Sequence, residues 1–127
     1  MPFRFRKHYT IEEARALLPE LRLWLAQLKN LRTRITQGDD RLAQIIASGV
    51  DAGGPLANTQ IRLMAEMQTL LTQFSRREIQ IKDLDRGLLD FPAIMAGREV
   101  FLCWEEDDDD IEFWHDLDSG FAGREKL

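Results

Sequence analysis

Cysteine, long apolar runs and clustered basic residues are all scarce in this chain. One of its 127 residues is a cysteine, Cys103, so no internal disulfide can form and nothing points to an oxidising compartment. No stretch approaches the roughly 18 uncharged apolar residues that a membrane-spanning helix needs. The basic residues near the start are not followed by the apolar run that a signal peptide would have. The sequence therefore predicts a cytoplasmic protein with a single domain, residues 1–127, and no membrane segment.

The C-terminal part of the chain has few of the basic residues that nucleic-acid binding would require. Residues 105–127 carry two basic and ten acidic side chains, whereas residues 1–60 carry nine basic and six acidic ones. A phosphate backbone would be repelled by the acidic section, and no basic stripe compensates for it. Apart from the short run Arg4 to His8, the composition argues against nucleic acid as a partner.

Apolar residues recur at helical spacing in two long stretches. The first predicts a helix over residues 10–47, opened by a capping box of Thr10 and Glu13 and bent near Pro19. A loop with three glycines follows at 48–54, and its end suits the first turn of a second helix over residues 55–81. Two helices of this length joined by a short connection predict an antiparallel helical hairpin.

The pattern changes after residue 81, where short runs of β-branched and aromatic residues alternate with turns. Strands are predicted at 88–92, limited by Pro92, at 99–104 and at 111–115, with an acidic connection at 105–110 and an irregular tail. Residues 83–127 therefore predict a small antiparallel β-meander of about three strands. The fold class is α+β, a long antiparallel helical hairpin followed by this β unit.

The hairpin predicts a partner, because two amphipathic helices alone bury one face each and leave their flanks exposed. A second copy would complete a four-helix bundle across a two-fold axis, so we expect a homodimer. The alternative is that the second helix satisfies its apolar stripe by folding tightly on the first. Met64 and Met67 are adaptable fillers that suit both arrangements.

Residues 83–124 hold the candidates for a metal site. The segment from His115 to Arg124 places an imidazole, two carboxylates and a guanidinium within ten residues, and a metal ion could be shared by His115 and Asp118. Acidic residues around the first turn of the β unit could add oxygen ligands, and Cys103 is also available. The candidate metal ligands are Asp83, Asp85, Asp90, His115 and Asp118. The alternative is structural: His115 ends a strand, the aspartates cap turns and Arg124 holds the tail through an ion pair.

Large aromatic side chains are frequent in the β unit, where they would form a ligand pocket, a docking surface or the mini-core of the sheet. Two arginines beside such rings would make an anion pocket. The candidate ligand-binding residues are Arg98, Trp104, Trp114, His115 and Arg124. Cys103, between Leu102 and Trp104, is expected to be an inert buried hydrophobe, because a nucleophilic thiol would need His115 as its base.

Several long strings resemble one protein family. They are Tyr9-Thr10-x-Glu12-Glu13-Ala14 with Leu17-Leu18-Pro19, Lys82-Asp83-Leu84-Asp85 with Gly87-Leu88 and Asp90-Phe91-Pro92-Ala93, Gly97-Arg98-Glu99-Val100-Phe101-Leu102-Cys103-Trp104, and Trp114-His115-x-Leu117-Asp118-x-Gly120-Phe121-Ala122-Gly123-Arg124. Together they resemble the uncharacterised bacterial domain-of-unknown-function family 2203. The resemblance spans nearly the whole chain except residues 36–60. It implies that the β unit and tail carry the motifs, and it names no activity, cofactor or catalytic residue.

Two functions are compatible with these features. The first is a non-catalytic interaction or assembly module, homodimeric through the hairpin, with the β unit as the end that recognises a ligand or a protein partner. The alternative is a metal- or small-ligand-binding protein, with enzymatic activity left open, whose site lies within residues 83–124. No phosphate-cradling glycine loop, HExxH sequence, paired CxxC or nucleophile elbow identifies a reaction.

Overall fold

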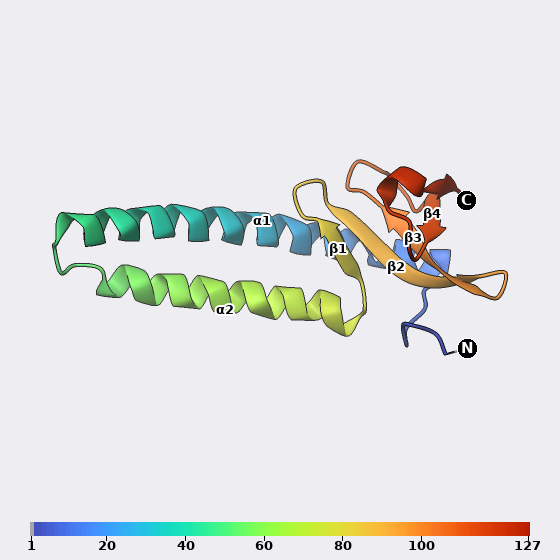
Figure 1. The fold of residues 1–127 in the computed structure, drawn as a ribbon, viewed down its shortest axis with the longest axis horizontal. Coiled ribbons are helices and arrows are strands. Elements are labelled where there is room, and N and C mark those ends of the chain that lie inside the picture. The colour runs from blue at the N-terminus through green and yellow to red at the C-terminus, as the bar shows by residue number, and fades with distance from the viewer. Residues whose placement is uncertain (1) are drawn as a thin grey trace. The chain divides into compact units, whose positions relative to one another are not determined.

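A computed structural model describes residues 2–127 and confirms the α+β class. Two helices, α1 (Ile11–Ser48) and α2 (Gly54–Arg76), precede one antiparallel sheet (Figure 1). Its five strands follow the order β1-β2-β3-β4-β5 and are β1 (Gln80–Asp83), β2 (Leu88–Met95), β3 (Arg98–Trp104), β4 (Phe113–Asp116) and β5 (Glu125–Lys126). A 3-10 turn, η1 (Phe121–Gly123), precedes β5. Within residues 2–127, neither helix is apolar enough over a sufficient length to cross a bilayer.

The chain forms two compact units. Unit 1 contains the described residues up to Leu25 together with Gln73–Leu127, and unit 2 is Ala26–Thr72. Unit 1 therefore holds the sheet and the first part of α1, and unit 2 holds most of the helical hairpin. The expectation of a single domain stays a prediction.

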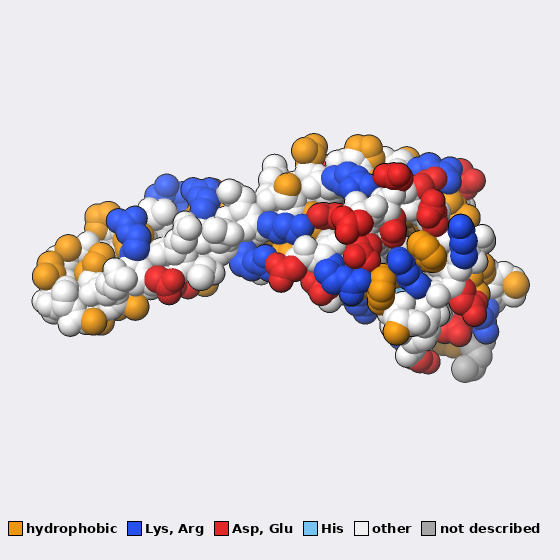
Figure 2. Space-filling view, turned by 90° about the horizontal axis from the view of Figure 1, so that it is seen from above, with side chains coloured by type: hydrophobic (Ala, Val, Ile, Leu, Met, Phe, Trp, Pro, Cys, Tyr) orange, Lys and Arg blue, Asp and Glu red, His pale blue; other side chains and the backbone are white. Residues whose placement is uncertain are grey.

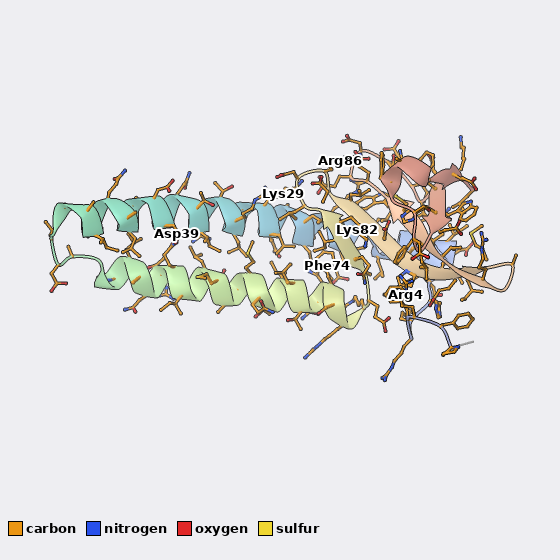
Figure 3. The ribbon with its side chains drawn as sticks, in the orientation of Figure 1. Arg4, Lys29, Asp39, Phe74, Lys82 and Arg86 are labelled. Carbon is orange, nitrogen blue, oxygen red and sulfur yellow. The ribbon has the colours of Figure 1, made fainter. Side chains whose placement is uncertain are left out.

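In unit 2, the two helices of the hairpin lie side by side (Figure 1) and bury apolar side chains. On α1, Leu28 and Leu31 are buried, and Leu63 is buried on α2. The buried amide of Gln60 donates to the carbonyl of Ile35 at 2.7 Å and to the carboxylate of Asp39 at 2.9 Å. Figure 3 shows the Asp39 side chain extending from α1 toward α2, as these hydrogen bonds require.

A second row on α2 is largely exposed, and of its five members only Ala57 is half-buried. It comprises Ala57, Ile61, Met64, Gln68 and Leu71, so its spacing alternates between four and three residues. The side chain of Ile61 is 66% exposed, that of Met64 is 57% exposed, and that of Leu71 is also exposed. At about 100° per residue, the charged residues of α2 before its last turn lie well away from this row. We call these five residues the outer row of α2.

The start of α1 follows its sequence signature. The Thr10 amide donates to the Glu13 carboxylate at 3.0 Å, and the Glu13 amide donates to the Thr10 hydroxyl at 3.1 Å, so the predicted capping box is present. Pro19 lies inside α1, and the bend expected there stays a prediction. Just before the helix, the Tyr9 amide donates to the Pro92 carbonyl at 2.7 Å and thereby joins the helix start to β2.

Two boundaries differ from the sequence expectation by three residues or more. The second helix, expected over 55–81, ends at Arg76, because Glu78 takes a left-handed conformation with φ of 57° and the Ile79 amide turns back to the Phe74 carbonyl. Residues 80–83 then form strand β1. The strand expected to stop at Pro92 continues to Met95 as β2, since β1 pairs only with residues 88–90 and leaves one side of β2 without a neighbouring strand at Pro92.

Charged side chains crowd the surface of the β unit, whereas the loop end of the hairpin is more apolar (Figure 2). Opposite charges on the β unit are paired: Arg86 meets Glu105 at 2.9 Å and Arg98 meets Asp116 at 2.9 Å. Near the hairpin loop, Ile46 and Val50 are exposed. Within the acidic section 105–110, Glu105 pairs with Arg86 and Asp108 pairs with Arg124, so arginines of unit 1 partly neutralise it.

Candidate functional site

Three neighbouring strands each place one reactive side chain on the same face of the sheet. Asp90 of β2 is opposite Cys103 of β3, and His115 of β4 is opposite Phe101, two residues from Cys103. Because side chains alternate along a strand, cross-strand partners and residues two apart share a face. The Asp90, Cys103 and His115 residues are 2%, 0% and 2% exposed, and one ligand atom of each lies within 4.8 Å of the other two.

Both ring nitrogens of His115 are engaged. Nδ1 lies 2.7 Å from the carbonyl oxygen of Asp116, and because a carbonyl can only accept, Nδ1 carries a proton and donates it. Nε2 lies 3.0 Å from Oδ1 of Asp90, so one proton is held between the imidazole and the carboxyl group. The backbone of β4 thus fixes which nitrogen of His115 faces its neighbours.

Burial shapes the ionisation of the other two groups. It raises the pKa of Asp90, and although the neighbouring His115 acts to lower it, the pKa remains above its ordinary value. Burial, together with the nearby Asp90, raises the pKa of Cys103 to about 12, against the opposing effect of the Arg124 guanidinium. At neutral pH the sulfur is therefore a thiol.

A cavity of about 180 Å³ opens over this cluster. Its lining combines the three buried groups with apolar side chains, one lysine and a glycine-containing turn: Lys82, Leu88, Asp90, Phe101, Cys103, His115, Leu117, Ser119, Gly120 and Phe121. Lys82 stands on β1 at this side of the sheet, with its Nζ 5.4 Å from the centre of the Phe101 ring (Figure 3). The three polar groups thus line the cavity, although each is almost inaccessible to water.

A guanidinium–aromatic cluster adjoins the cavity. The Arg124 guanidinium carbon lies 3.8 Å from the centre of the Phe113 ring and 4.1 Å from that of Phe121, and Arg86 lies 4.2 Å from the Phe121 ring. Arg124 also pairs with the Asp108 carboxylate at 3.3 Å, so it holds the tail against the acidic connection. Arg124 is thus a neighbour of the buried cluster, with its charge already balanced.

The candidate metal ligands separate in the structure. Asp90 and His115 come together, whereas the Asp118 side chain is 91% exposed and pairs with Arg4 at 3.3 Å. Asp83 accepts from the Arg86 amide at 3.1 Å, as a turn-capping aspartate does. Among residues 2–127, no group of three potential ligands other than Asp90, Cys103 and His115 comes together.

The remaining candidate ligand-binding residues lie around the sheet in separate places. Trp104 is fully buried and donates from Nε1 to the Asp108 carbonyl at 3.0 Å. Arg98 is paired with Asp116, and its guanidinium lies 5.8 Å from the centre of the Trp114 ring. Neither Arg98 nor the two tryptophans line the cavity over the buried cluster.

Cys103 was expected to be inert, and its place beside Asp90 depends on strand register. Ala96 and Gly97 form a two-residue turn with φ of 51° and 76°, the positive values of a tight hairpin. This turn pairs Met95 with Arg98 and, counting outward, Asp90 with Cys103. The Ala96-Gly97 turn was therefore the signal in the sequence that could have brought Cys103 into the site.

Comparisons with known proteins support the resemblance that the sequence motifs suggested. Neither the curated proteins nor the solved structures gave a match to the chain. A family model does match: DUF2203, described as an uncharacterized conserved protein, covers residues 7–127. Because this match includes the hairpin, the sheet and the buried cluster, the chain belongs to the DUF2203 family.

Proposed function

We propose that this protein is a non-catalytic interaction module, in which two copies pair through the outer row of α2 and the cavity of each β unit serves as the recognition end. The observation that carries the proposal is the outer row itself. Its aliphatic members Ile61, Met64 and Leu71 are exposed, although they repeat with the spacing of a helix–helix seam. Exposed apolar rows of this kind mark protein contacts.

The two apolar rows of α2 fit a four-helix bundle. The row that includes Gln60 and Leu63 contacts α1, and the outer row lies one residue further along, about 100° around the helix. In a bundle, each helix contacts two neighbours and so needs two adjoining apolar rows. The second neighbour that the proposal supplies is α2 of another copy.

The outer row is also compatible with a copy of itself. It is centred on Met64, with Ala57 and Leu71 seven residues to either side. In an antiparallel pairing across a two-fold axis at Met64, the small Ala57 of each copy would meet the larger Leu71 of the other. Charged residues are absent from this face of α2, as is usual for the centre of an interface.

The geometry of the buried cluster supports binding in preference to covalent catalysis. Burial raises the pKa of Cys103 to about 12, so at neutral pH the sulfur is a thiol and a poor nucleophile. His115 has both nitrogens occupied, so it is not positioned as a base that activates the thiol. A buried reduced thiol also suits the cytoplasm, which we propose as the location.

The dimer can be tested by light scattering coupled to size exclusion. Wild-type protein is expected to elute as a dimer at micromolar concentration, and Ile61→Lys with Met64→Lys should weaken the dimer at least about 100-fold by placing charges in an apolar seam. Leu23→Lys is the matched control, because Leu23 is 65% exposed but lies on α1, and it should remain a dimer. A wild-type monomer at high concentration, or a double variant that still dimerises, would overturn the proposal.

A further inference from the structure

We infer that Asp90, Cys103 and His115 form a binding site for a divalent transition-metal ion of the Zn²⁺ class, with three protein ligands and a fourth position open to the cavity. The inference goes beyond the proposed dimer, because all three ligands belong to unit 1 whereas the outer row of α2 belongs to unit 2. It assigns a role to three buried polar groups that the packing of a small sheet does not require.

The spacing of the ligand atoms is close to what a tetrahedral ion demands. Bonds of about 2.3 Å to sulfur and about 2.0–2.2 Å to nitrogen or oxygen place neighbouring ligand atoms about 3.3–3.7 Å apart. Here Oδ1 of Asp90 and Nε2 of His115 are 3.0 Å apart, and no pair among the three ligand atoms exceeds 4.8 Å. Adjustments of about 1 Å or less would therefore bring all three to one ion.

The histidine is oriented as metal-binding histidines are. Its Nδ1 donates to a backbone carbonyl 2.7 Å away, which leaves Nε2 as the nitrogen that faces Asp90 and Cys103. Metal-ligating histidines nearly always fix their second nitrogen with a carbonyl or carboxylate in this way. This contact is independent of the clustering of the three ligands, and it points to the same use of His115.

The ligand set also selects the kind of ion. One thiolate, one imidazole and one carboxylate would match Zn²⁺ or Co²⁺, whereas Mg²⁺ and Ca²⁺ prefer oxygen ligands alone. With Asp90 and Cys103 both ionised on binding, their two negative charges would balance the ion. The neighbouring Arg124 pairs with Asp108 at 3.3 Å and its positive charge also favours the ionised form of Cys103, the form that binds a metal ion.

The cavity supplies the entry path and the fourth position. It reaches all three ligands and holds about 180 Å³, enough for an ion with one or more water molecules. Three protein ligands with one open position are typical of sites where the ion meets an exchangeable ligand, and four protein ligands are typical of closed structural sites. The recognition end would then present a metal ion at the floor of its cavity.

Cobalt substitution tests the inference on the intact full-length protein. Because Cys103 is the sole cysteine, a thiolate-to-Co²⁺ charge-transfer band in the near ultraviolet can come only from this residue. We expect wild-type protein to bind one Co²⁺ per chain with this band, and Zn²⁺ to displace it. Failure to bind Co²⁺ or Zn²⁺, or binding without the thiolate band, would overturn the inference.

Substitutions test two of the three ligands. Cys103→Ser and His115→Gln should each weaken Zn²⁺ binding at least about 100-fold in competition with a chromophoric chelator, with folding confirmed by circular dichroism. Asp118→Asn is the matched control, since this exposed carboxylate lies outside the cluster and should leave the affinity unchanged. Equal loss in all three variants would contradict the assignment. Because the dimer is measured separately by light scattering, either proposal can fail while the other stands.

Discussion

The Glu99 side chain of β3 binds the segment that precedes α1. Its carboxylate accepts from the backbone amides of Arg4 at 2.8 Å and Phe5 at 2.9 Å, and it lies 2.7 Å from Nε2 of His8. Burial alone would raise the pKa of Glu99, but the hydrogen bonds from His8 and the two amides outweigh it and lower the pKa. A single side chain thus holds three residues that precede α1.

This carboxylate makes stability depend on pH. Because the pKa of Glu99 is lower in the folded protein than its ordinary value of 4.5, its contribution is present above that pH and is lost as the pH falls through the folded-state pKa. Glu99→Gln removes the ionisation at every pH. The difference in melting temperature between wild type and variant should therefore be largest near pH 7 and shrink toward pH 3.

Thermal denaturation at a series of pH values measures this difference, and the exposed Glu20→Gln serves as the control that should show little difference anywhere. A gap between wild type and Glu99→Gln that stays constant from pH 7 to pH 3 would show that charge is not the source of the effect.

At this scale the sequence placed Asp90 and His115 among five candidate metal ligands and named Cys103 only as a further available donor. Residue type brought Asp90 and His115 into the candidate set, but it also selected Asp83 and Asp118, which lie elsewhere. Cys103 and the exposed Asp118 could not be assigned from type, since their positions depend on strand pairing and on how the tail turns. Proximity across strands is a property of register, which local composition does not encode.

Along the helices, Gly38 and Gln60 form a close contact between α1 and α2. A Cβ added at Gly38 would lie 2.0 Å from Oε1 of Gln60, so the absence of a side chain on α1 leaves the space that the buried amide fills. The amide of Gln60 in turn satisfies the carbonyl of Ile35 and the carboxylate of Asp39. The two residues therefore act as a pair.

We expect the effect of Gly38→Ala on stability to depend on Gln60. In wild type it should destabilise by about 1 kcal/mol, because displacing the amide loses hydrogen bonds worth roughly 1 kcal/mol each and outweighs the helix propensity gained. In a Gln60→Ala background the same change should stabilise by up to about 1 kcal/mol. Urea denaturation of the four proteins gives the coupling.

The control is Gly54→Ala, since a Cβ at Gly54 meets no atom within 4 Å. Its effect should be the same with Gln60 or Ala at position 60. If the effect of Gly38→Ala on stability is also the same with Gln60 or Ala at position 60, the methyl group introduced by Gly38→Ala and the Gln60 amide do not compete for the same space.

Helical elements were more predictable than short strands. The apolar period and the capping box of Thr10 and Glu13 are local signals, and the structure contains the helix that they predict. The end of α2 was missed because its apolar period runs on to residue 81, while the break depends on a left-handed conformation at Glu78. Strands β1 and β5 span four and two residues and are defined by their neighbours in the sheet, so they leave little trace in local sequence.

For the molecule as a whole, the two proposed binding events belong to different compact units. The metal ligands belong to unit 1 and the outer row of α2 to unit 2. We therefore expect their free energies to be additive. Zn²⁺ loading should change the dissociation constant of the dimer by less than about two-fold. The double variant Ile61→Lys with Met64→Lys should likewise change the Zn²⁺ affinity by less than about two-fold.

Sedimentation equilibrium with and without Zn²⁺ and chelator competition on the double variant measure the two constants. A tenfold change in either would reveal coupling between the units, worth about 1.4 kcal/mol.

The two units also differ in when they can form during synthesis. Unit 2 ends at Thr72, whereas unit 1 joins residues before Leu25 to strands that end at Lys126. At about 5–20 residues per second, a ribosome needs roughly 3–11 s to make the 54 residues that separate these two points. The hairpin contacts are local and fast to form, so α2 is available to meet a neighbouring nascent copy while the strand that carries His115 is still unmade. Under the proposed dimer, chains translated from one message would pair before their β units close.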